Sequence, residues 1–227
     1  MRPSELRALT VAAVRERLLP FGWKWRAKSR EFRRPTARGW HSVTLADILH
    51  WDDVDFEIYF RIRIDLLERE ITARASPELG EEVLRHSAML GNNVRYWYGH
   101  TGRRYTVADP RDVPAVADRI AADVMTEAVA LLERFSDLRA VFKIIGGNLR
   151  ETGAWGLVGN DAHRGALAVT LAHAYGDPLA MRATYRAHME SIPLQGPWHL
   201  VSFQRYLDET NGGLAVAATL SKAGLIP

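Results

Sequence analysis

The chain has 227 residues, of which 47% are hydrophobic and 25% charged, a balance typical of a folded globular protein and not of a disordered one. It has no cysteine, which excludes disulfides, thiolate metal sites and a cysteine nucleophile. No apolar stretch has the pattern of a signal peptide or the length of a membrane span, so we expect a cytoplasmic protein without a membrane partner.

The first predicted element is a helix over residues 4–19, in which apolar side chains recur on one stripe until Pro20 and Gly22 end it. From Trp23 the period of the pattern changes to two, which predicts a hairpin over residues 23–34. A further strand is predicted over residues 40–49. The chain therefore begins with a helix and continues as antiparallel strands.

The strongest local pattern lies in residues 54–66, where apolar and polar side chains alternate. A helix would spread a period-two pattern around its cylinder, whereas a strand places all the apolar side chains on one face. We therefore predict a long central strand with one face in the core and the other in water.

Later segments extend this sheet and cover it. Residues 94–98 and 104–107 predict a hairpin around Gly99 and Gly102. Apolar residues spaced three or four apart over residues 113–135 predict a long helix that packs on the apolar face of the sheet. The order predicts an α+β fold, an antiparallel β-meander packed on an N-terminal helix and a long helix.

The composition changes after residue 145, where five glycines punctuate residues 146–159. Four more helices are predicted after this stretch, over residues 161–175, 178–190, 198–208 and 213–223. We therefore predict an α+β sheet domain over residues 1–145. A glycine-punctuated loop and a mostly helical C-terminal region, residues 146–227, would pack on it.

Several features occur in a fixed order within residues 4–140. A helix ends in Leu-Pro-Phe-Gly-Trp at residues 19–23, a basic-aromatic hairpin follows, Trp40 opens a strand, and residues 105–113 lead into the long helix. In this order the segment resembles a bacterial family of domains of unknown function, family 4304. The resemblance implies an α+β fold. It implies no site residues, because the family has no assigned reaction.

The polar face of the 54–66 strand is the first candidate binding surface. Its charged side chains lie about 7 Å apart, at every second residue. They could dock a partner protein, hold paired carboxylates for acid–base chemistry, or form ion pairs with neighbouring strands. The candidate residues are Asp55, Glu57, Tyr59, Arg61 and Arg63.

The basic-aromatic hairpin is the second candidate surface, because residues 1–40 hold eleven Arg or Lys and only three Glu. Basic side chains could follow a phosphate backbone while aromatic rings stack on bases. The alternation also allows the tryptophans to enter the core and leaves the charges as a solvated stripe on an edge strand. The candidate residues for nucleic acid are Lys24, Arg26, Lys28, Arg33 and Arg34.

The remaining patterns assign no chemistry. His50 with Asp52, Asp53 and Asp55 could bind a divalent cation, but aspartates are also common in turns. Tyr96 and Tyr98 could anchor an interface, the glycines of residues 153–159 lack phosphate-loop spacing, and the other histidines show no metal-ligand pair. We therefore assign no catalytic residue, no metal ligand and no cofactor.

The predicted function is protein binding without catalysis, as an immunity-like or partner-neutralising bacterial module. The alternatives are nucleic-acid binding through residues 24–38, and an enzyme whose site lies between the sheet and the C-terminal helices. The sequence identifies neither the partner nor the oligomeric state.

Overall fold

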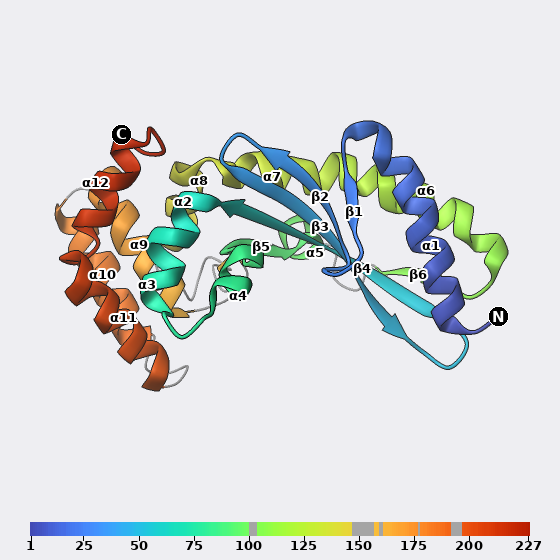
Figure 1. Cartoon of the computed structure of the whole chain (residues 1–227), viewed down its shortest axis with the longest axis horizontal. Helices are drawn as coiled ribbons and strands as arrows, with labels where there is room; N and C mark the ends of the chain where they lie inside the picture. Colours follow the sequence, from blue (N-terminus) through green and yellow to red (C-terminus); the bar gives the residue numbers. More distant parts are fainter. Residues whose placement is uncertain (100–103, 147–156, 159–160, 177, 192–196) are drawn as a thin grey trace. The chain divides into compact units, whose positions relative to one another are not determined.

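The computed structural model describes residues 1–99, 104–146, 157–158, 161–176, 178–191 and 197–227 (Figure 1). They form two compact units. The first comprises Met1–Arg61 and Asn92–Glu133, and the second comprises Ile62–Gly91 and Arg134–Pro227. The division passes through a strand and groups residues 62–91 with the C-terminal helices, whereas the sequence predicts one boundary at residue 145.

The sheet is antiparallel, and five of its six strands follow one another in chain order, with β6 paired to β4. The predicted meander and the α+β class are therefore confirmed. The strands are β1 (Lys24–Arg26), β2 (Glu31–Thr36), β3 (Gly39–Leu49), β4 (Val54–Ile64), β5 (Leu90–Asn93) and β6 (Tyr105–Val107).

Two long helices form the helical layer of the first unit. Helix α1 (Pro3–Leu18) lies beside α6 (Val113–Asp123), as Figure 1 shows. The Arg17 guanidinium joins them, with Nε 2.5 Å from Asp118 Oδ1 and Nη2 donating to the Pro114 carbonyl at 3.2 Å. The short elements of this unit are η1 (Leu19–Phe21), α5 (Val94–Tyr98), η3 (Pro110–Asp112) and η4 (Val124–Ala128).

The predicted long helix is present as α6, η4 and α7 (Val129–Ser136), which follow one another along the chain. Its apolar stripe is buried, including Val116, Ile120, Val124 and Leu131. This burial explains why residues spaced three or four apart are apolar, because they share the face that leaves water.

One predicted strand is wrong. Residues 94–98 form the short helix α5 and not one arm of a hairpin. The Asn93 side chain accepts a hydrogen bond from the Arg95 backbone N–H at 3.1 Å, which caps the helix start. Gly99 ends the helix in the left-handed region, with φ +68°. The Asn93 cap and the left-handed Gly99 favour a helical turn, and they outweigh the β preference of the aromatic residues between them.

The second unit is helical and is built around α9 (Asp161–Tyr175), against which α8, α10, α11 and α12 pack. Every side chain from Asp161 to Ala172 is buried, as expected for a helix surrounded by others. The other helices are α2 (Asp65–Leu67), η2 (Glu68–Thr72), α3 (Ala73–Ala75), α4 (Glu81–His86), α8 (Leu138–Ile145), α10 (Pro178–Ser191), α11 (Pro197–Thr210) and α12 (Leu214–Lys222).

In the part of the chain that the structure describes, no helix combines the length and the apolarity needed to cross a membrane.

Candidate functional site

The polar face of β4 is less exposed than the alternation predicts. Asp55 and Glu57 are 8% and 6% exposed, so the expectation of a water-facing side is wrong for these two carboxylates. Tyr59, Arg61 and Arg63 are half-buried. Buried carboxylates must be compensated by cations or hydrogen bonds, and the first unit provides both.

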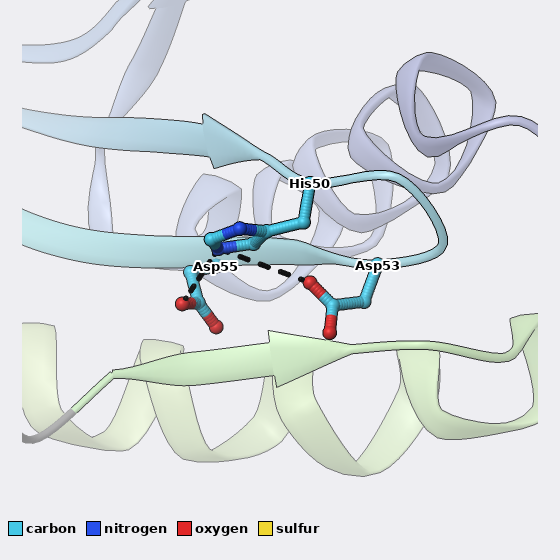
Figure 2. A group of neighbouring side chains, drawn as sticks. All are labelled: His50, Asp53 and Asp55. Atoms are coloured by element: carbon cyan, nitrogen blue, oxygen red, sulfur yellow. Dashed lines mark hydrogen bonds and ion pairs between the residues drawn. The ribbon is translucent and has the colours of Figure 1, made fainter.

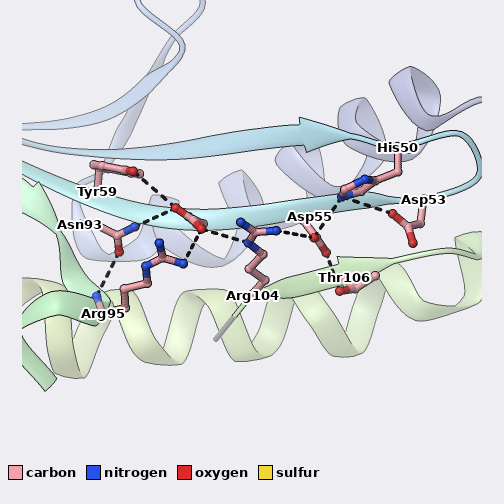
Figure 3. A network of polar contacts seen from close by, with 9 residues as sticks. His50, Asp53, Asp55, Tyr59, Asn93, Arg95, Arg104 and Thr106 are labelled. Carbon is pink, nitrogen blue, oxygen red and sulfur yellow. Dashed lines mark hydrogen bonds and ion pairs between the residues drawn. The ribbon is translucent and has the colours of Figure 1, made fainter. Parts of the chain in front are cut away.

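Glu57 accepts hydrogen bonds from four side chains that Figure 3 labels, and we name the five residues the Glu57 cluster: Glu57, Tyr59, Asn93, Arg95 and Arg104. Its Oε1 accepts from Arg95 Nη1 at 2.6 Å and from Arg104 Nε at 3.1 Å. Its Oε2 accepts from Asn93 Nδ2 at 2.8 Å and from the Tyr59 hydroxyl at 3.4 Å. The carboxylate is therefore fully engaged within its own unit, and it has no free charge to offer a partner or a substrate.

Asp55 extends the cluster toward the β3–β4 turn. Its Oδ1 accepts from Thr106 Oγ1 at 2.6 Å, and its Oδ2 lies 3.1 Å from His50 Nε2 and 3.4 Å from Arg104 Nη1. Burial alone would raise the pKa of Asp55, but the hydrogen bonds from Thr106, His50 and Arg104 together lower it. Asp55 is therefore held as a carboxylate and is a poor general acid at neutral pH.

His50, Asp53 and Asp55 form the group closest to a metal site among the described residues (Figure 2). Their potential ligand atoms all lie within 4.8 Å of one another. Asp55, however, already has Arg104 as a cationic neighbour. An ion pair therefore explains the arrangement, and we assign no metal to it.

The turn that joins β3 to β4 exposes apolar side chains. It is a tight turn, in which the His50 backbone N–H donates to the Asp53 carbonyl at 3.0 Å. Trp51 at its apex is 97% exposed, and Ile48 and Leu49 beside it are also exposed. We name Ile48, Leu49, Trp51 and Asp52 the β3–β4 tip. In the sequence, the only signal for it is a tryptophan inside an aspartate-rich turn.

The predicted nucleic-acid residues are not all on one exposed surface. Lys24, Arg26 and Lys28 are exposed, whereas Arg33 and Arg34 are half-buried. Arg33 forms an ion pair with the buried Glu31, and its guanidinium lies 3.7 Å from the ring centre of Trp40. Arg34 lies 5.0 Å from the ring centre of Trp23. The structure thus separates this set into three exposed cations and two cations held against tryptophans.

A groove of about 400 Å³ lies between α1 and the β1–β2 hairpin. Ala8 and Trp25 are among the residues that line it, with Arg7, Arg15 and Arg30 as its cations. Arg7 and Arg30 both form ion pairs with Asp47. No pattern in the sequence indicates this groove, because α1 and the hairpin meet only in the folded unit.

Three of the described histidines are buried, His41 in the first unit and His163 and His188 in the second. In the second unit, His163 Nε2 lies 3.0 Å from Ser76 Oγ, and both side chains are buried. Burial lowers the pKa of His163 to about 4, so the imidazole is a weak base at neutral pH. Burial also lowers the pKa of His41 and of His188 to about 4. These environments stabilise neutral imidazoles and do not favour proton abstraction.

Other sequence candidates are dispersed. Arg63 belongs to the second unit, where Nε lies 2.5 Å from Asp65 Oδ1 and Nη1 donates to the Ser87 carbonyl at 2.9 Å. Tyr96 on α5 is 70% exposed, and Tyr98 donates to the Glu127 carbonyl at 3.2 Å. His100, residues 153–156 and residues 159–160 lie outside the described residues.

Comparisons of the chain with protein-family models, curated proteins and solved structures find no match, so the resemblance of residues 4–140 to family 4304 stays a prediction.

Proposed function

We propose that the protein is a protein-binding module that contacts its partner through the β3–β4 tip. The observation that carries this proposal is the exposure of Trp51, which is 97% in the isolated chain. Tryptophan is enriched among the residues that contribute most of the binding energy of protein interfaces. Exposed Ile48 and Leu49 extend the apolar surface around it.

The tip is held in shape before it binds. The His50 backbone N–H closes the turn onto Asp53, while the His50 ring lies 3.1 Å from the Asp55 carboxylate. A preformed turn loses less conformational entropy on binding, which favours affinity. Asp52 is exposed and forms no ion pair with a described residue. The expected partner surface is therefore an apolar pocket with basic residues at its rim.

The occupied carboxylates support binding over catalysis. In the first unit, Asp55 and Glu57 are held by cations, and we find no pair of free acid and base groups among the described residues of this face. An immunity-like or partner-neutralising role is compatible with a rigid tip that presents one large anchor residue.

The proposal is tested by comparing two exposed tryptophans. Wild-type protein, Trp51→Ala and Trp198→Ala are used to capture proteins from the native lysate after nuclease treatment. Trp198 lies on α11 and is 60% exposed, which makes it a matched control. We expect a protein retained by wild type and Trp198→Ala to bind Trp51→Ala about 30-fold more weakly, because loss of an interface anchor costs about 2 kcal/mol. Equal retention by all three baits would contradict the proposal.

Nucleic-acid binding is the second candidate, and it is favoured by one observation. Lys24 and Arg26 are exposed on the edge strand β1, and neither forms an ion pair with any described residue. Between them in sequence, Trp25 lines the groove beside α1. Cations and an aromatic ring on the same short strand are the two kinds of group that contact the phosphates and the bases of a single strand.

This candidate is tested by fluorescence anisotropy with a labelled single-stranded DNA of mixed sequence. The variant Lys24→Gln/Arg26→Gln is expected to bind about tenfold more weakly than wild type. It should also reduce the slope of log K against log salt by about 1.4, since each lost phosphate contact contributes about 0.7. Arg205→Gln, an exposed arginine on α11, is the control. Salt-independent binding, or equal loss in the control, counts against a nucleic-acid site.

A further inference from the structure

The second unit contains a cavity of about 700 Å³ that is distinct from the β3–β4 tip. Residues of α9 and α10 line it, together with the turn between α11 and α12. The volume falls within the range of about 300–1,000 Å³ that small-molecule sites occupy in proteins. All of the described residues that line it belong to one unit, so this lining does not depend on how the two units are placed.

Its α11–α12 wall is built by an unusual turn. Asn211, Gly212 and Gly213 have φ angles of +50°, +64° and +91°, all in the left-handed region. A Cβ on Gly213 would lie 3.2 Å from the Thr170 backbone N and Cα, so only glycine allows this close approach of the turn to α9. The His173 Nε2–H donates to the Gly212 carbonyl at 3.0 Å. This hydrogen bond ties the wall to α9.

The α10 wall provides positive charge. Arg182 and Arg186 are four residues apart, so they project from the same face of the helix. Both are exposed, and neither guanidinium makes a hydrogen bond or an ion pair with any residue that the structure describes. Each therefore keeps its donors available to a ligand. Among the described residues that line the cavity, Glu190 is the one acidic residue, so the described lining has a net positive charge.

The remaining lining is suited to an apolar body. Val169 on α9 is buried, Met189 is half-buried, and Tyr185 lies between the two arginines in sequence. Methionine and tyrosine adapt to flat apolar and aromatic groups, while the tyrosine hydroxyl can add a hydrogen bond. A cavity with apolar walls and two neighbouring guanidiniums at one side combines shape selection with anion recognition.

We propose that this cavity binds a small organic anion, in which a carboxylate, sulfonate or phosphate on an aromatic or apolar body is held by Arg182 and Arg186. The bound anion would accept hydrogen bonds from both guanidiniums, and its apolar body would contact Val169, Tyr185 and Met189. The inference is independent of the protein-binding function, because it concerns the other unit and different residues.

The test uses two probes that share one aromatic framework. Anilinonaphthalene sulfonate carries a sulfonate, phenylnaphthylamine is its neutral counterpart, and both fluoresce more strongly in apolar surroundings. Fluorescence titrations give the Kd of each probe for the full chain and its variants. We expect Arg182→Gln/Arg186→Gln to raise the Kd of the sulfonate roughly tenfold or more, since hydrogen bonds to charged groups are the stronger ones. The Kd of the neutral probe should stay within about twofold.

Two further variants separate recognition from misfolding. Glu190→Gln removes the acidic residue of the lining and should lower the Kd of the sulfonate about threefold, a gain that a damaged fold would not produce. Arg205→Gln on α11 removes one positive charge, half of what the double arginine variant removes, but it is not among the residues that line the cavity, and it should leave both Kd values unchanged. The proposal is overturned if the sulfonate Kd does not respond to the arginine and glutamate variants, or if both probes lose affinity equally.

Discussion

The free energy of unfolding is expected to fall steeply as the pH decreases from 6.5 to 4, because buried neutral histidines take up protons when the chain unfolds. Burial lowers the pKa of His163 and of His188 from 6.5 to about 4. The charge of Glu78 opposes the lowering of the His163 pKa and His199 adds to it, while the charge of Arg164 adds to the lowering of the His188 pKa. His41 in the first unit shifts in the same direction, through burial and the charge of Arg34.

The sign follows from proton uptake. Below pH 6.5 the unfolded chain binds a proton at each histidine, whereas the folded protein binds it only near pH 4. The stabilisation is therefore complete above pH 6.5 and is lost as the pH falls through this window. For each pH unit below 6.5, His163 and His188 should each lower the free energy of unfolding by about 1.4 kcal/mol, which is roughly 3 kcal/mol per unit for the two together. The whole free energy of unfolding of a domain is only about 5–15 kcal/mol, so this loss is a large fraction of it.

Urea unfolding at pH 7, 6 and 5 measures this effect above the range in which Asp55, whose pKa is lowered, takes up a proton. The free energy of unfolding should decrease at each step. His163→Gln and His188→Gln should each have a shallower pH dependence than wild type. His86→Gln, at an exposed position on α4, should keep the wild-type slope. A free energy of unfolding that stays constant from pH 7 to pH 5 would contradict the prediction, because it would show that these imidazoles take up protons as readily in the folded protein as in the unfolded chain.

The second large effect is expected from Glu57→Leu, which removes the central acceptor of the Glu57 cluster and keeps a similar volume. Asn93, Arg95 and Arg104 all donate to this carboxylate. Without it, the buried Asn93 amide loses an acceptor, whereas the guanidiniums of Arg95 and Arg104 are partly accessible to water, so the expected cost is about 1–3 kcal/mol. Because Asn93 also caps α5, the loss should loosen α5 as well as β4.

Urea unfolding again provides the measurement, with Tyr59→Phe as the matched control. The Tyr59 hydroxyl contributes only a 3.4 Å hydrogen bond to the same carboxylate, so its loss should change stability by less than about 0.5 kcal/mol. Hydrogen exchange should show faster exchange in residues 94–98 of Glu57→Leu and not of Tyr59→Phe. Equal stability of Glu57→Leu and wild type would mean that solvent replaces the network without cost.

The elements that the sequence predicts correctly are those whose pattern is long enough to be unambiguous. The alternation spans residues 54–66, and β4 covers Val54–Ile64 of it, after which Asp65–Leu67 form the short helix α2. The stripe that begins at Val113 continues into Ser136 through α6, η4 and α7. In both cases one face of the element is buried in the core. The period of the apolar residues then distinguishes a strand, with period two, from a helix, with a period of three to four.

Short segments are different, because local caps decide them. Residues 94–98 are rich in aromatic side chains, but the Asn93 cap and the left-handed Gly99 produce one helical turn. A five-residue segment contains too few side chains for its period to distinguish a strand from a helix.

The candidate sites depended almost entirely on tertiary structure. Alternation identified Asp55 and Glu57 as the polar face of a strand, but only the folded unit brings Arg95 and Arg104, about 40 to 50 residues later, onto their carboxylates. The cavity beside Arg182 also exists only because α9, α10 and a three-residue left-handed turn converge. By itself, the sequence determined the fold class and the long elements, since these follow from hydrophobic periodicity along the chain. Which charges are paired and which remain available was decided by contacts between distant residues, and no local pattern encodes those contacts.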